Sequence, residues 1–111
     1  AEEIEDVGKS EQRELASRMA VLLAHLLKWQ YQPERRGNSW KRTIRHQRER
    51  IALTLRRTPS LKATLAAPDW QREMWLDGID QAERETGLEI FPESCPWAMD
   101  EEVLNPTWHP S

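Results

Sequence analysis

One long run of residues carries apolar side chains at helical spacing, and it constrains the fold more than any other feature of the chain. The apolar positions recur at steps of three and four, with Glu11 as one polar member of the series: Ile4, Val7, Leu15, Met19, Leu22, Leu26 and Trp29. Such spacing places them on one face of an α-helix. Ala20, Leu23 and Leu27 widen this face, so we expect a central helix with two neighbouring elements packed on it.

Breaking and capping residues set the limits of this helix. Gly8 and Ser10 leave open whether it is kinked or broken near residues 8 to 10, because glycine costs about 1 kcal/mol in a helix interior and serine can cap a new start. Pro33 ends the helix, since proline lacks the backbone donor and clashes with the preceding turn. The segment 37–39 (Gly-Asn-Ser) then supplies a loop and an N-cap for the next helix.

Three more helices are expected after this loop. The second long helix runs to about Arg57 and has a buried stripe formed by Trp40, Ile44, Gln47, Ile51 and Leu55. Ser60 can cap a short helix through Leu65. Pro68 opens a third long helix that Gly87 closes, with an inner face formed by Trp70, Met74, Trp75, Ile79 and Ala82. The Pro-rich tail allows one or two helical turns near residues 99–104.

The chain of 111 residues is therefore predicted to be all-α: one domain over residues 1–111, a small helical bundle with three main helices, a short fourth and a Pro-rich C-terminal arm. The longest apolar run, residues 19–27, is interrupted by His25 and is too short for a membrane span. No signal segment is visible, so a cytoplasmic location is the default and no membrane contact is expected. Cys95 is the only cysteine of the chain and therefore cannot form an intramolecular disulfide.

Charge divides the chain into three blocks. Residues 28–57 hold ten of the sixteen basic residues against Glu34 and Glu49, a net charge of +8, whereas residues 1–27 carry −3 and residues 58–111 carry −8. Lys41, Arg45 and Arg48 share one face of the second long helix, and Arg35 and Arg36 flank its entrance. These five residues are the candidate partner contacts.

The basic face admits two kinds of partner. Nucleic acid is one, because cations in a row neutralise phosphates, but a pI near 5.6 is unlike the strongly basic domains that bind nucleic acid tightly. Protein is the other. The acidic residues of the third long helix, Asp69, Glu73, Asp77 and Asp80, could pair with the basic helix within one chain or between two chains. We favour a protein partner or a homodimer, and keep nucleic-acid binding through residues 35–57 as the alternative.

Residues able to support catalysis or metal binding are few and scattered. His25 could ligate a metal with His46 or His109, or act as a general base beside an acid such as Glu14 or Asp100. No HxxxH, HExxH or CxxC spacing gathers ligands on one face. An enzyme using His25 is thus a second alternative, and we predict no cofactor, no metal site and no catalytic residue.

Two further residue types have a structural interpretation. Cys95 lacks a neighbouring base in sequence and is expected to be a small buried apolar residue. Trp29 and Trp40 continue apolar stripes and, with Trp97 in the tail, are predicted to be packing anchors rather than a stacking surface for bases.

Four segments of the chain, HLLKWQYQPERR, SWKRTIRHQRERI, ETGL and FPESCPW, resemble a bacterial family catalogued as domain of unknown function twenty-nine. The resemblance covers essentially the whole chain in the family's order and spacing. It implies a small cytoplasmic α-helical protein, typically with a further N-terminal amphipathic helix ahead of EEIE, and no established activity. Because the chain starts at Ala1 without that helix, we expect a trimmed fragment, in which part of the face around Leu22 and Leu26 would be bare.

The sequence thus predicts a non-enzymatic protein-interaction or regulatory helical module. Arg35, Arg36, Lys41, Arg45 and Arg48 are the expected contact residues, and substituting the arginines is expected to spare folding.

Overall fold

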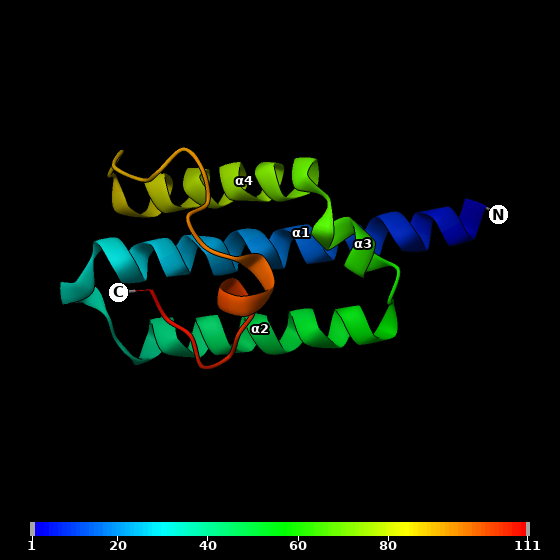
Figure 1. The fold of residues 1–111 in the computed structure, drawn as a ribbon, viewed down its shortest axis with the longest axis horizontal. Coiled ribbons are helices and arrows are strands. Elements are labelled where there is room, and N and C mark those ends of the chain that lie inside the picture. The colour runs from blue at the N-terminus through cyan, green and yellow to red at the C-terminus, as the bar shows by residue number, and fades with distance from the viewer. Residues whose placement is uncertain (1, 111) are drawn as a thin grey trace.

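The computed structural model describes residues 2–110 of the chain, and the side chains of residues 9–110. Its central element is α1 (Glu2–Tyr31), a helix of 30 residues. The helices α2 (Asn38–Arg57) and α4 (Pro68–Thr86) lie along two sides of α1, with α1 between them (Figure 1). The predicted all-α bundle around a central helix is confirmed.

The wide apolar face of α1 is the centre of the core. Leu15, Met19, Leu22, Leu23, Leu26 and Leu27 are fully buried, and Trp29 is 8% exposed. The face around Leu22 and Leu26, expected to be bare without a preceding helix, is therefore covered. The side chains of Ile4 and Val7 lie outside the described residues. Glu11, the polar member of the series, accepts a hydrogen bond from the Thr58 hydroxyl just beyond the end of α2.

The helix limits follow the breaking residues closely. The helix α1 continues through Gly8 and Ser10 without a break, because tertiary packing can outweigh the small helical preference of these residues. It ends before η1 (Pro33–Arg35), a single 3₁₀ turn with proline at its start. Gly37, within the predicted segment 37–39, is the extended N-cap residue of α2. Ser60 is the N-cap residue of the next helix but makes no side-chain cap bond.

A short helix and a glycine position α4. The helix α3 (Leu61–Ala66) buries Leu61 and Leu65 and connects α2 to α4. Gly87 adopts φ 75° and ends α4 in the left-handed conformation, as the sequence predicts. Gly78 allows α4 to approach α1 closely, since a Cβ atom at this position would lie 2.8 Å from the Cβ of Leu23.

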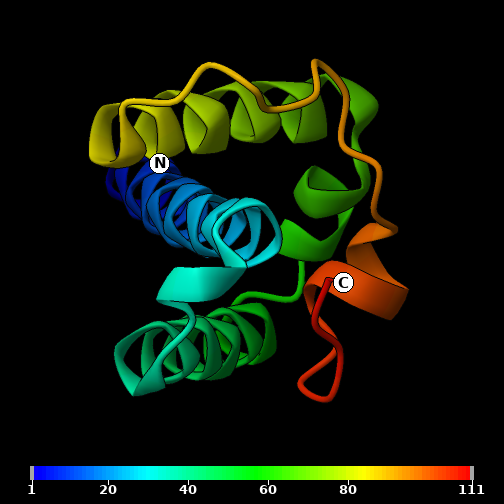
Figure 2. The ribbon, with the colours of Figure 1, turned by 90° about the vertical axis from the view of Figure 1, so that its left-hand side faces the viewer.

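Residues 88–110, which we call the arm, leave the end of α4 and cross one side of the three-helix layer (Figure 2). The arm contains η2 (Met99–Val103), a single wide π-helical turn where the sequence predicts one or two helical turns. The Trp75 indole donates to Pro92 O at 3.0 Å, and the Trp97 ring packs edge-on against Trp75 and Trp108 with centroids 5.7 and 5.6 Å away. Aromatic packing thereby fixes the arm on the core.

No helix in the part of the chain that the structure describes combines the length and apolar character needed to cross a membrane.

Candidate functional site

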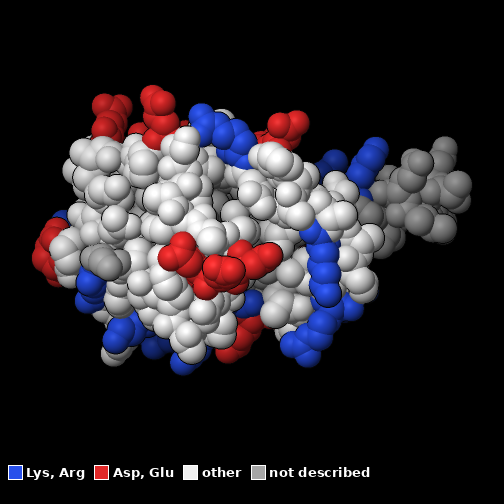
Figure 3. Space-filling model, in the orientation of Figure 1, with Lys and Arg blue, Asp and Glu red and all other residues white. Residues whose placement is uncertain are grey.

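Basic and acidic side chains lie on opposite edges of the layer. The exposed cations of α2 that form its outer edge are Lys41, Arg42, Arg45 and Arg56, with Glu49 the only acid of this helix; we call these four residues the basic edge. The acidic edge is formed by four exposed acids of α4, Asp69, Glu73, Asp77 and Asp80. A fifth exposed acid of this helix, Glu85, pairs with Lys28 instead. Figure 3 shows acids along the α4 edge and cations along the α2 edge.

The two edges do not pair within the chain. Because α1 lies between α2 and α4 (Figure 1), the alternative in which the acidic helix pairs with the basic helix within one chain is not realised among residues 9–110. Among residues 9–110, the ion pairs instead start from α1: Lys28 with Glu85 at 2.5 Å, and Glu14 with Arg18 at 3.6 Å and with Arg57 at 3.3 Å. The basic edge therefore faces solvent.

Four of the five predicted contact residues occupy two different environments. Arg35, Lys41 and Arg45 are exposed on η1 and α2. Arg36 is half-buried, donates from Nε to Trp29 O at 2.6 Å and lies over the Trp29 ring at 5.0 Å. Arg36 therefore helps to hold the turn after α1. Arg42 was not among the predicted contact residues, but it is exposed on α2 one turn before Arg45. The spacing of three residues between Arg42 and Arg45 places them on one helix face, and this was the available signal.

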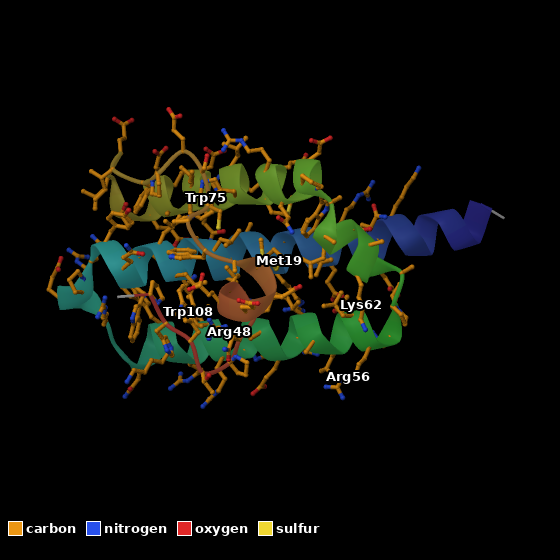
Figure 4. All side chains as sticks on the ribbon, viewed as in Figure 1. Met19, Arg48, Arg56, Lys62, Trp75 and Trp108 are labelled. Atoms are coloured by element: carbon orange, nitrogen blue, oxygen red, sulfur yellow. The ribbon has the colours of Figure 1, made fainter. Side chains whose placement is uncertain are left out.

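Arg48, the fifth residue, differs from its predicted role. It is 5% exposed, and its guanidinium donates from Nε to Val103 O at 2.9 Å and from Nη2 to Trp108 O at 2.9 Å and Glu102 O at 3.4 Å. Figure 4 shows Arg48 between α2 and the arm, whereas Arg56 points away from the bundle. Arg48 therefore has a structural role, contrary to the expectation that it can be substituted without affecting the fold.

The predicted tryptophan anchors all contact the core. Trp29 is buried, while Trp40 and Trp97 are half-buried and pack against the core residues. The Lys28 ammonium lies 5.3 Å from the centroid of the Trp40 ring, and Trp97 lies between two other indoles. Such partly buried aromatic groups fix the ends of α1, α2 and the arm relative to each other.

A pocket of about 430 Å³ lies between α2 and the arm. We call it the arm pocket; its wall includes Lys41, Arg45, Arg48, Leu104, Pro106 and His109. The His109 ring packs 5.0 Å from the Trp29 ring. Burial, followed by the positive charges of Arg48, Lys41 and Arg36, lowers the pKa of His109. The arm pocket therefore combines positively charged side chains with an apolar wall.

His25 lies elsewhere, with neighbours different from those expected for a general base. Its Nδ1–H donates to Val21 O at 2.8 Å. Burial lowers the pKa of His25 and outweighs this hydrogen bond, which raises it; the charge of Lys28 lowers the pKa further, and the charge of Glu85 raises it. Glu14 is eleven positions away along α1, about 16 Å at the rise of an α-helix, and contacts Thr54 and Arg57 instead. The structure therefore does not bring His25 together with Glu14.

The remaining candidate groups are also separated. The Cys95 thiol is half-buried and donates to Trp97 O at 3.4 Å, and burial raises its pKa. A raised pKa disfavours the nucleophilic thiolate. Within residues 9–110, the histidine, cysteine and carboxylate side chains form no cluster of three or more able to hold a metal ion.

Comparison with known protein families gives a match over nearly the whole chain. The model of the family described as "Domain of unknown function DUF29" matches residues 1–109. No curated protein and no solved structure matches the chain.

Proposed function

This chain belongs to the DUF29 family, and we propose that it acts as a non-enzymatic protein-interaction module whose basic edge receives an acidic surface of another protein. The observation that carries the proposal is the state of the basic edge. Within residues 9–110, no carboxylate lies within ion-pair distance of Lys41, Arg42 or Arg45, although the chain has nineteen acids and sixteen bases.

A row of cations with few negative charges nearby favours binding of an acidic partner. Like charges at neighbouring helical positions repel each other, and an opposing acidic surface relieves this repulsion. Each exposed ion pair formed would add only about 0–1 kcal/mol. The row would therefore contribute chiefly to the rate and orientation of association, and apolar groups of the partner would add affinity.

The charge of the whole chain supports a protein partner over nucleic acid. The sequence pI is about 5.6, and the acidic edge on the far side of the layer would repel phosphates in most orientations. Domains that bind nucleic acid tightly are usually basic overall.

The positions of the edges support a different protein rather than a second copy of this chain. The basic and acidic edges point in opposite directions (Figure 3). Pairing them between copies would be a head-to-tail contact, which builds open chains or rings rather than a two-fold dimer. For the compartment we propose the cytoplasm, where the unpaired Cys95 thiol stays reduced.

Capture from a cell extract with two charge-matched variants tests the proposal. Arg42→Glu with Arg45→Glu reverses two cations of the basic edge, and Lys9→Glu with Arg13→Glu reverses two exposed cations of α1. Nuclease-treated extracts should yield the same acidic protein with the wild type and the α1 variant, and at least tenfold less with the edge variant.

Three results would contradict it. Equal capture by both variants would exclude the basic edge, and capture that disappears after nuclease treatment would favour nucleic acid. Formation of oligomers by the purified protein alone, disrupted by added salt, would favour self-association.

A further inference from the structure

The arm pocket has the size and surface of a small-molecule site. Its volume of about 430 Å³ falls within the roughly 300–1,000 Å³ typical of ligand pockets. Ile44, Ala52, Leu104 and Pro106 give it an apolar wall, contributed partly by α2 and partly by the arm. The pocket therefore exists only where the arm is held against α2.

Arg48 lies in this wall with part of its guanidinium unused. The residue is 5% exposed, and Nε and Nη2 make all of its hydrogen bonds to protein atoms in residues 9–110, three bonds to main-chain carbonyls. Its Nη1 atom donates to no protein atom there yet stays accessible to solvent, since Arg18 Nε is the one fully buried side-chain atom without a partner in these residues. Arg48 forms no ion pair with a carboxylate of these residues. Buried charges in proteins usually have an opposite charge beside them.

Other cationic groups converge on the same pocket. Lys41 and Arg45 are exposed at its rim, and His109 lies in its wall. Glu49 is the only carboxylate lining it. An anion in the pocket would meet a buried guanidinium and two exposed cations, while its apolar part would contact the aliphatic wall.

We propose that the arm pocket binds a small amphipathic carboxylate, with the carboxylate on Arg48, Lys41 and Arg45 and the apolar body against Ile44, Ala52 and Leu104. Guanidinium groups suit this anion because their N–H donors match the geometry of carboxylate oxygens. The proposal does not depend on a protein partner, since the site lies within one chain. It adds a ligand to the interaction module described above.

Octanoate is a suitable probe. Octan-1-ol is a control with a similar apolar body but no charge, and acetate is a control with the same charge but almost no apolar body. Titration of the full chain followed by NMR should show saturable 1:1 binding of octanoate, and binding of octan-1-ol and acetate weaker by at least tenfold. The pKa of His109 should rise on binding, because the anion offsets the charges of Arg48, Lys41 and Arg36 that face this ring beside Trp29.

Two charge reversals on α2 provide the matched comparison. Arg45→Glu at the rim should weaken octanoate binding about tenfold, the effect of losing one charge-assisted contact. Arg56→Glu carries the same charge change on the same helix but lies outside the pocket wall, and should leave the affinity within twofold.

Several outcomes would overturn the proposal. Equal binding of octan-1-ol would show that the cations are not used, equal weakening by the two reversals would indicate a diffuse charge effect, and absence of saturable binding would remove the site. None of these outcomes would decide whether a protein binds the basic edge, which the capture experiment tests separately.

Discussion

Arg48 Nε donates to the carbonyl oxygen of Val103 at 2.9 Å, so that a buried cation of α2 holds a residue 55 positions later in the arm. The same guanidinium reaches Trp108 O at 2.9 Å. The Val103 carbonyl lies at the end of η2, where main-chain acceptors have no helical partner, and the Trp108 carbonyl lies five residues further along the arm. They solvate the guanidinium as water would, and Arg48 thereby connects the arm to the bundle and completes the arm pocket.

Replacing Arg48 with methionine should destabilise the fold by about 2–4 kcal/mol, because buried carbonyls would lose charge-assisted hydrogen bonds. Urea unfolding followed by circular dichroism measures this change. The control is Arg45→Met on the exposed rim, which should change stability by less than about 0.5 kcal/mol. Equal stability of the two variants would show that the arm does not depend on Arg48.

Substituting Gly78 with alanine should destabilise the fold although alanine is the better helix former. The added Cβ would lie 2.8 Å from the Cβ of Leu23, forcing α1 and α4 apart. Overpacking costs about 1–3 kcal/mol, which exceeds the gain of about 1 kcal/mol in helix propensity. Thermal unfolding gives the sign. Gly37→Ala is the control, since its nearest neighbour would be 3.9 Å away, and an increase in Tm for Gly78→Ala would refute the close packing.

Glu85 should contribute to the loss of stability in acid. Burial alone would raise its pKa, but hydrogen bonds from Lys28 and Gln81 and the charge of Lys28 outweigh burial and lower the pKa below the ordinary 4.5. A lowered folded-state pKa means that the stabilisation is present above pH 4.5 and is lost as the pH falls through the folded value. Urea midpoints across this range should fall less steeply for Glu85→Gln than for the wild type. Parallel curves would show that the ion pair has no net effect.

His25 should make stability depend on pH near neutrality. Burial, the largest influence, lowers its pKa from 6.5, so the unfolded chain binds more protons just below that value. The stabilisation is therefore complete above pH 6.5 and decreases as the pH falls toward the folded-state pKa. His25→Gln should remove this part of the profile, as measured by urea unfolding between about pH 5 and 8. An unchanged profile would place the titration on another group.

The elements of the fold could be predicted because they depend on local signals. The wide stripe of α1 requires two neighbours, and Gly87 adopts the left-handed conformation that ends a helix. The start of α2 also follows a local signal, since its N-cap residue, Gly37, lies in the predicted segment 37–39.

The site depends on contacts that spacing alone does not reveal. Arg48 is four residues after Ile44 and three before Ile51, a position at the border of the buried stripe, but its acceptors lie 54 to 60 positions away. In the sequence, the opposite charges of α2 and α4 suggest that these two helices pair. Complementary charge does not reveal, however, that another helix lies between α2 and α4. Only the packing of both helices on α1 separates the two edges.

Photo-cross-linking from the basic edge in living cells shows whether this edge receives an acidic protein. A benzophenone amino acid at Glu49 keeps all four cations of the edge, and the same group at Gln12, exposed on α1, is the control. We expect one discrete protein adduct from position 49, which is lost when Arg42 and Arg45 are reversed to glutamate, and none from position 12. Adducts to nucleic acid, or equal protein adducts from both positions, would contradict the claim that the basic edge receives an acidic protein.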